Sequence, residues 1–170
     1  MPTLLLILGP TGVGKTELSL RVAEHYGCPI LNCDSRQVYR GIPIGTAAPT
    51  AEEQARVKHY FVATRELEED YNAGQYERDA LALLDELFLT HEVVVMTGGS
   101  MLYADAVCYG LDDLPRAIEL IQQNTRHYAK RQMTWFRRDT HIHRLNANDD
   151  YEKNIHRIDD LLRTGSLQED

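Results

Sequence analysis

The sequence has few cysteines, no long apolar run and no excess of positive charge. Its three cysteines are an odd set without a C-x-x-C pair, which argues against a disulfide framework and a zinc site. The apolar run Leu4–Leu8 is too short to span a membrane and has no basic flank, so we expect neither a membrane span nor a signal peptide. The net charge of −8 argues against a wholly basic nucleic-acid-binding surface. We therefore expect a cytoplasmic protein in a reducing compartment.

The chain has the size and composition of one ordinary globular domain. Its 170 residues are 43% hydrophobic and 26% charged, which suffices for a buried core without disulfides or metals. We find no internal repeat or low-complexity segment, so we treat residues 1–170 as a single domain.

Short apolar runs alternate with helical patterns through the first part of the chain. We predict strands at Thr3–Leu8, Pro29–Cys33, Val57–Ala63 and Val93–Met96, and helices at Thr16–Tyr26, Tyr76–Leu89 and Met101–Cys108. The later chain predicts helices at Ala117–Arg138 and Tyr151–Leu162 and a short strand at Ile142–Leu145. Strands that alternate with helices predict an α/β fold with a central parallel sheet flanked by helices.

Residues 7–16, ILGPTGVGKT, fit the pattern G-x-x-x-x-G-K-[ST] between a predicted strand and a predicted helix. Such a loop points several backbone N–H groups into one concavity at the positive end of the helix dipole. Lys15 would contact phosphate oxygens, and the Thr16 hydroxyl would reach a Mg²⁺. We predict a di- or triphosphate ligand, most often ATP for this motif, on the three-layer fold of the P-loop nucleotide kinases. The binding residues would be Gly9, Pro10, Thr11, Gly12, Val13, Gly14, Lys15 and Thr16.

The carboxylate of the site is expected at Asp34. Nucleotide hydrolases usually hold their metal with an acid after a later strand, but Val93–Met96 runs into Thr97–Ser100 with no acid. Asp34 follows the second strand, where a carboxylate beside a phosphate site can accept a proton from an attacking group. Ser35 and Gln37 follow with neutral groups suited to reading a base edge.

Two further expectations come from the stretch after Val93–Met96. Because no carboxylate follows this strand, we expect no meaningful ATPase activity. Ser100 either caps the helix Met101–Cys108 or offers its hydroxyl at the strand end, and both readings stay open.

The segment Leu120–Arg138 contains no acidic residue. Arg126, Lys130 and Arg137 fall at i, i+4 and i+11 and share one face of the predicted helix, and Arg131 lies beside them. Random surface charge would give a face of mixed sign. The one-sign stretch therefore predicts contact with an anion, which could be a phosphate ligand, an RNA backbone or both.

Five stretches occur in one order along the chain: GPTGVGKTELSL, NCDSRQVYRGIPIGTAAPT, YNAGQYERDA, MTGGSMLYADAVCYGLDDLP and IELIQQNTRHYAKRQMTWFRRD. Together they cover most of residues 3–139, and they resemble the bacterial tRNA dimethylallyltransferases, the IPP transferase family. The most specific parts are D-S-R-Q-V-Y followed by I-G-T-A, and K-R-Q-M-T-W-F-R-R. The resemblance implies transfer of a dimethylallyl group from its diphosphate to the exocyclic amine of the adenine just 3′ of a tRNA anticodon.

The resemblance also implies roles for individual residues. Thr11–Thr16 would hold the donor's diphosphate with Mg²⁺ near Thr16, and Lys15 and Thr16 would act at the departing diphosphate. Asp34 would be the general base on the adenine amine. The residues expected to contact tRNA are Asp34, Ser35, Arg36, Gln37 and Ser100, with Arg126, Lys130, Arg131 and Arg137 as further phosphate or tRNA contacts. The expected partners are dimethylallyl diphosphate and tRNA, with no membrane, and the expected state is a monomer.

The chain departs from the family in length. Only Arg116 and Ala117 separate Asp112-Asp113-Leu114-Pro115 from the IELIQQNTR segment, whereas these are far apart in family members. We expect the junction of a missing helical tRNA-binding insertion near residues 115–117. Two alternatives therefore stay open: an adenylate prenyltransferase or small-molecule kinase on the same scaffold, and a diphosphate-binding core that is inactive on tRNA.

Overall fold

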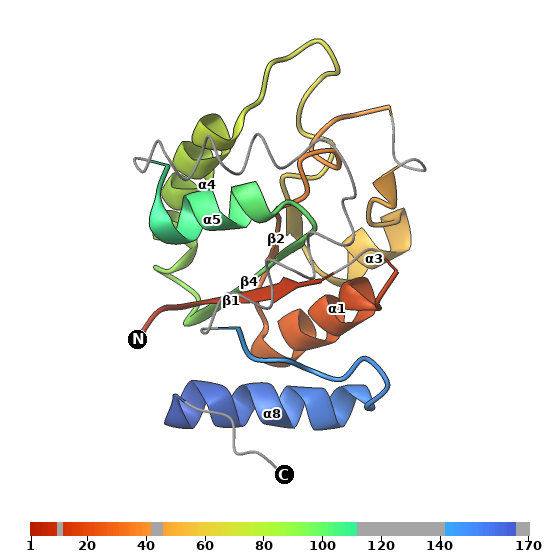
Figure 1. The fold of residues 1–170 in the computed structure, drawn as a ribbon, viewed down its shortest axis with the longest axis vertical. Coiled ribbons are helices and arrows are strands. Elements are labelled where there is room, and N and C mark those ends of the chain that lie inside the picture. Colours follow the sequence, from red (N-terminus) through yellow and green to blue (C-terminus); the bar gives the residue numbers. More distant parts are fainter. Residues whose placement is uncertain (10–11, 42–45, 112–141, 166–170) are drawn as a thin grey trace.

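The computed structural model describes residues 1–9, 12–41, 46–111 and 142–165. These residues form a parallel sheet of four strands with helices on both faces (Figure 1). The strands are β1 (Thr3–Leu8), β2 (Ile30–Asn32), β3 (His59–Tyr60) and β4 (Val93–Gly98), in the spatial order β1-β4-β2-β3. The predicted α/β architecture with a central parallel sheet is confirmed.

The described helices are α1 (Lys15–Tyr26), α3 (Ala51–Arg56), α4 (Ala73–Leu87), α5 (Met101–Tyr109) and α8 (Tyr151–Thr164). α1 ends at Gly27, whose φ of 60° is the left-handed conformation common after a helix. α4 begins with a reciprocal capping box, in which Asn72 and Gln75 each bond the other's backbone N–H. None of the helices in the described part is long and apolar enough to cross a membrane.

The two faces of the sheet bury different side chains, because residues along a strand point alternately to either side. Leu31 and Met96 pack with α4 and α5 in one core. Ile30 and Val95 pack with α1 and α8 in the other. Both faces of β2 and β4 are therefore covered, which explains their continuous apolar character.

The register brings the carboxyl ends of three strands to one edge of the sheet. Leu8 of β1 lies opposite Gly98 of β4, and Asn32 of β2 lies opposite Thr97. The Thr97 hydroxyl donates to the Ile7 carbonyl at 3.0 Å, which ties β4 to β1 beside the phosphate loop. Ligand sites of open parallel sheets lie beyond such an edge.

Two predicted strands are wrong in extent or existence. The strand predicted at Val57–Ala63 is reduced to His59–Tyr60, because Phe61 (φ 60°) and Ala63 (φ 50°) adopt left-handed conformations that end the extended chain. Ile142–Leu145 is irregular rather than a strand, since it forms no ladder with the sheet. The predicted helix Ala117–Arg138 lies outside the described residues.

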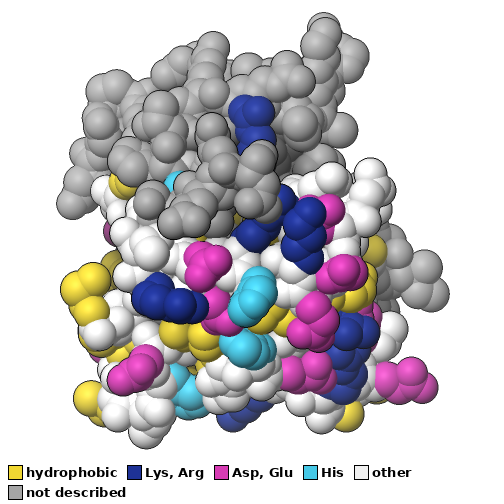
Figure 2. All heavy atoms as spheres, turned by 90° about the horizontal axis from the view of Figure 1, so that it is seen from below, with side chains coloured by type: hydrophobic (Ala, Val, Ile, Leu, Met, Phe, Trp, Pro, Cys, Tyr) yellow, Lys and Arg dark blue, Asp and Glu magenta, His cyan; other side chains and the backbone are white. Residues whose placement is uncertain are grey.

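The C-terminal helix α8 is fixed to α1 by a small polar cluster. The Tyr26 phenol donates to Asp159 Oδ1 at 2.5 Å, and His25 Nε2 lies 3.2 Å from the same oxygen. The face of the molecule on this side carries Lys, Arg, Asp, Glu and His side chains close together (Figure 2). This mixture of signs is typical of a solvated surface and not of an anion-binding patch.

Candidate active site

The phosphate-loop motif lies between β1 and α1, as the sequence predicts. Gly12 (φ 81°) and Gly14 (φ 91°) both need the left-handed conformation that glycine adopts without strain. A Cβ atom on Gly9 would lie 3.3 Å from Val13 Cγ1 and 3.6 Å from Lys15 Cδ, so the lysine stem folds back over the loop. Pro10 and Thr11 are outside the described residues.

Lys15 is half-buried at the first turn of α1. Burial lowers the pKa of its ammonium group, and the nearby Asp34 carboxylate acts in the opposite direction. The charges of Lys15 and Asp34, both predicted site residues, therefore interact across the edge of the sheet. A lysine that is partly stripped of water is prepared to bind an anion, because a phosphate replaces the lost hydration.

We predict a specific pH dependence for diphosphate binding through Lys15. Bound diphosphate favours the charged ammonium, so the affinity for diphosphate falls as pH rises through the Lys15 pKa. Because burial lowers that pKa, the fall occurs at a lower pH than it would for an ordinary lysine. Calorimetric titration with inorganic diphosphate between about pH 7 and pH 10 measures it. Lys15→Ala should weaken binding roughly 10- to 100-fold, since hydrogen bonds to charged groups contribute about 1.5–3 kcal/mol.

Lys15→Arg is the matched control for that measurement, because a guanidinium keeps its charge throughout the range. The ratio of the affinities of the unaltered chain and Lys15→Arg should therefore fall with rising pH. A constant ratio would contradict a role of Lys15 in binding the anion.

Asp34 begins a tight turn in which three successive backbone amides donate to side-chain oxygens. Asp34 N donates to Asn32 Oδ1 at 3.2 Å, and Ser35 N donates to Ser100 Oγ at 2.8 Å. Arg36 N donates to Asp34 Oδ1 at 2.9 Å. Within the described residues no hydrogen bond reaches Asp34 Oδ2, so this oxygen is available to a proton donor. We call residues 34–36 the Asp34 turn.

Ser100 supports the Asp34 turn with its side chain and begins α5 with its backbone. It is the N-cap residue of α5, and its carbonyl accepts the Tyr103 and Ala104 N–H groups, but its side chain makes no cap hydrogen bond. Its hydroxyl donates to Ser35 Oγ at 2.9 Å while it accepts the Ser35 N–H. A contact of Ser100 with tRNA stays a prediction.

Gln37 also serves the protein's own backbone. Its Nε2 donates to the Thr46 and Ala47 carbonyls at 3.0 and 3.1 Å. A contact of Gln37 with tRNA stays a prediction, and the fully used amide nitrogen leaves Oε1 as the atom to make it. Arg36 is exposed next to it.

Gly98 at the end of β4 is a site residue that the sequence analysis missed. A Cβ atom there would lie 2.6 Å from the Cys33 carbonyl carbon and 2.7 Å from Asp34 N. Only glycine lets β4 approach the start of the Asp34 turn this closely. The available signal was a glycine within a strand, which often marks a close backbone approach.

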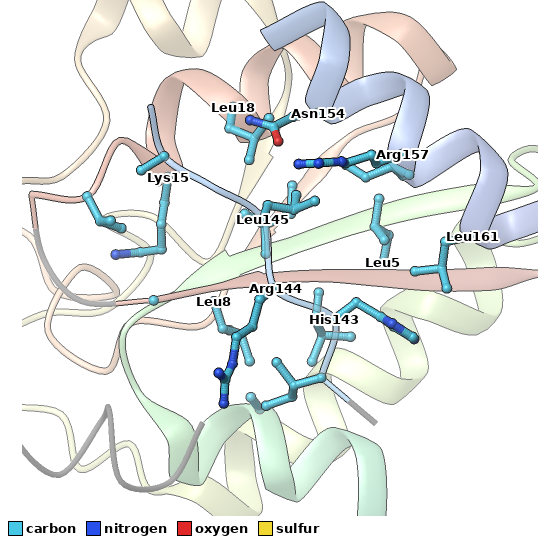
Figure 3. A pocket seen from close by; sticks show the side chains of 18 of the residues that line it. Leu5, Leu8, Lys15, Leu18, His143, Arg144, Leu145, Asn154, Arg157 and Leu161 are labelled. Carbon is cyan, nitrogen blue, oxygen red and sulfur yellow. The ribbon is translucent and has the colours of Figure 1, made fainter. Parts of the chain in front are cut away.

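A cavity of about 550 Å³ runs along β1 between α1, α5, α8 and residues 142–147 (Figure 3). Lys15 reaches it at one end, and leucines such as Leu5, Leu18 and Leu161 form much of its wall. Asp34 is not among its lining residues. A group held at the Asp34 turn therefore lies outside this cavity.

The described part of the chain offers few ligands for a metal. It contains no group of three or more His, Cys, Asp or Glu side chains arranged to hold an ion. Thr16 is exposed at the start of α1 and presents one hydroxyl oxygen beside the loop. Mg²⁺ commonly takes one or two protein oxygens and completes its shell with phosphate oxygens and water, so the residues present fit this ion.

The predicted site residues divide into two groups. Lys15, Asp34, Ser35 and Ser100 all lie at the carboxyl edge of the sheet, where Ser100 contacts the Asp34 turn directly and Asp34 acts on Lys15 through its charge. The predicted basic face cannot be placed, since Arg126, Lys130, Arg131 and Arg137 lie outside the described residues, as does the junction near residues 115–117.

Comparison with known sequences identifies one family. The family model described as IPP transferase matches residues 37–117 and 111–139. A tRNA dimethylallyltransferase 2 from Parabacteroides distasonis is 61% identical over 115 residues, which are 68% of this chain and 38% of that protein. A tRNA dimethylallyltransferase 1 from Bacteroides thetaiotaomicron is 57% identical over 115 residues, 68% of this chain and 37% of that protein. The matched region thus spans well under half of these relatives' length.

Comparison with solved structures gives the same result for the fold. A tRNA isopentenylpyrophosphate transferase from Bacillus halodurans superposes with a TM-score of 0.62 at 27% identity. The match covers 98% of this chain and 57% of the other. The described sheet and helices are thus similar to part of a larger protein.

Proposed function

Because the chain belongs to the IPP transferase family, we propose that it transfers a dimethylallyl group from dimethylallyl diphosphate to tRNA. The acceptor is the exocyclic amine of the adenine just 3′ of the anticodon. The observation that carries this proposal is that a phosphate loop with Lys15 and a carboxylate turn with Asp34 lie at the same edge of the sheet. The names of the relatives support the choice of donor and acceptor.

The fold in this proposal is the three-layer fold of the P-loop nucleotide kinases. Three observations support it: the strand–loop–helix unit of β1 and α1, the two left-handed glycines of the loop, and the helices on both faces of the sheet. The ligand differs from that of a kinase, because the loop holds the diphosphate of a prenyl donor.

The donor side of the site binds and stabilises the leaving group. Backbone N–H groups of residues 9–16 and the Lys15 ammonium hold the diphosphate. The Thr16 hydroxyl would hold a Mg²⁺, whose chemistry would be to supply positive charge to the leaving group. Lys15 adds a fixed positive charge where the negative charge of the diphosphate grows during the reaction.

The acceptor side activates the adenine amine. The nitrogen lone pair forms a bond to the first carbon of the dimethylallyl group, while the bond from that carbon to the diphosphate oxygen breaks and its electron pair leaves with the diphosphate. Asp34 takes the proton that the amine loses. Ser35, Arg36, Gln37 and Ser100 hold the tRNA around this adenine, and the protein acts as a monomer in the cytoplasm.

The part of its relatives that this chain matches affects the affinity that we expect for tRNA. Its match spans 38% of the Parabacteroides distasonis relative, and we place the junction of a missing tRNA-binding insertion near residues 115–117. Much of the affinity for a nucleic acid comes from phosphate contacts, so we expect weakened tRNA binding. Donor binding depends on the loop and should persist.

The test incubates the protein and Mg²⁺ with labelled dimethylallyl diphosphate and, in separate reactions, tRNA, an anticodon stem-loop and AMP. We expect label on the tRNA adenine and none on AMP. We also expect no steady hydrolysis of ATP, because β4 ends at Gly98 and continues into Gly99 and Ser100 without a carboxylate. Label on AMP alone, or ATP hydrolysis that Lys15→Ala abolishes, would favour one of the small-molecule enzymes. Donor binding without transfer to any acceptor would indicate an inactive core.

A further inference from the structure

Asn32, the last residue of β2, uses its whole side-chain amide within the protein. It is only 2% exposed. Its Oδ1 accepts from Asp34 N at 3.2 Å. Its Nδ2 donates to the Phe61 carbonyl at 2.9 Å and to the Asp34 carbonyl at 3.3 Å. A buried amide with its two donors and an acceptor engaged fixes the backbone groups that it contacts.

The contacts of Asn32 hold both ends of the Asp34 residue. Its N–H and its carbonyl are bound by the same amide, so the peptide planes on either side of the Asp34 Cα atom cannot turn independently. The direction in which the Asp34 side chain leaves the backbone is therefore set two residues earlier in the chain. Asn32 itself is fixed by α4, because the Tyr76 phenol donates to the Asn32 carbonyl at 2.9 Å.

The Phe61 contact connects Asn32 to a strained loop. Phe61 and Ala63 have positive φ angles although neither is glycine. Such strain costs about 1–3 kcal/mol per residue and persists only where the surroundings impose it. Ala63 N donates to the Gln37 carbonyl at 2.9 Å, and Thr64 N donates to the Val38 carbonyl at 2.8 Å. The loop thus supports the chain on both sides of the Asp34 turn.

We infer that Asn32 is a positioning residue for the general base, which it fixes by joining Asp34 to the loop at residues 61–63. It does not touch the substrate and acts only through Asp34. This inference rests on the proposed function, since the base must accept a proton from the bound amine. General-base catalysis depends on hydrogen-bond reach, so a small displacement of Asp34 slows the proton transfer without changing the phosphate loop.

Two variants of the full chain test this role. Asn32→Ser keeps a neutral hydroxyl that can accept from Asp34 N but is too short to donate to the Phe61 carbonyl, and Asn32→Ala loses all three hydrogen bonds. We expect kcat for transfer to tRNA to fall roughly 10- to 100-fold in both. The KM for dimethylallyl diphosphate and the affinity for inorganic diphosphate should stay within about twofold, because neither depends on where Asp34 points.

Tyr26→Phe is the control, since it removes a partly buried hydrogen bond, from the Tyr26 phenol to Asp159 of α8, at the far end of α1 from the phosphate loop. It should lower the melting temperature without lowering kcat at a temperature where it is folded. Asn32→Ser is measured if Asn32→Ala fails to fold. Unchanged kcat in Asn32→Ser, or a parallel loss of diphosphate affinity, would overturn the inference. No transfer by the unaltered chain would overturn the proposed function and this inference with it.

Discussion

Replacing Asp34 with asparagine is expected to reduce prenyl transfer to tRNA by roughly 100- to 10,000-fold, the range that general-base catalysis contributes. An asparagine side chain can still accept the Arg36 N–H through Oδ1, so the Asp34 turn should keep its shape. It cannot take up the proton of the adenine amine at neutral pH. Single-turnover transfer from labelled dimethylallyl diphosphate measures the loss, and calorimetry with inorganic diphosphate should show binding retained.

Asp85→Asn controls for the change in net charge. Asp85 is exposed on α4, and its substitution removes the same unit of negative charge outside the Asp34 turn. It should leave transfer unchanged. Full transfer activity in Asp34→Asn would exclude Asp34 as the base, and loss of diphosphate binding would show that the carboxylate acts mainly on the loop.

Gly98→Ala should be strongly destabilising and should also disturb the site. The added methyl group would overlap the backbone, with its carbon 2.6 Å from the Cys33 carbonyl carbon, and a backbone atom cannot move aside as a flexible side chain can. Overpacking of this kind costs about 1–3 kcal/mol and occasionally more. Urea unfolding measures the loss of free energy of unfolding, and transfer activity should fall because the methyl group also meets Asp34 N.

The matched control is Gly74→Ala in the first turn of α4. A Cβ atom there has its nearest neighbour at 3.5 Å, an ordinary van der Waals distance. Alanine restricts the unfolded chain and favours a helix, so this substitution should be neutral or stabilising by up to about 1 kcal/mol. Equal effects of the two substitutions would contradict the close approach of β4 to the Asp34 turn.

The elements that the sequence predicts well are those whose signals are local. β1 and β4 are short apolar runs that end in glycine, and α1 follows a phosphate-loop motif. α4 has a clear apolar face and a capping box. For these elements the residue pattern and the final burial agree, so no knowledge of distant contacts is needed.

The elements that were missed depend on contacts from elsewhere or have little apolar content. α3 has no buried residue, so hydrophobic periodicity cannot find it, although the capping box of Thr50 and Glu53 is a usable signal. Ile142–Leu145 has the apolar residues of a strand but forms no ladder, and Leu145 packs against the core on the α1 side instead. A run of residues does not reveal whether a neighbouring strand is within reach.

The residues of the candidate active site also divide into those with a local signal in the sequence and those that depend on distant contacts. Lys15 and Asp34 carry their chemistry in their own side chains, so a motif and a strand end suffice to find them. Gly98 and Ser100 act by meeting Cys33, Asp34 and Ser35, which are far away in the sequence, and only the pairing of β4 with β2 brings them together. Nothing in the sequence distinguishes Asn32 from other polar residues, because its role depends on the Phe61 carbonyl that the fold places beside it.

The strand order also determines how far apart the two reactants are held. β4 separates β1, which carries the phosphate loop, from β2, which carries Asp34. Neighbouring strands are about 4.8 Å apart, so the two half-sites are offset by about 10 Å. A nucleophile must come within about 3–3.5 Å of the atom it attacks. For the proposed transfer, the donor therefore has to extend from the loop across the end of β4 to bring its first carbon to the amine at Asp34.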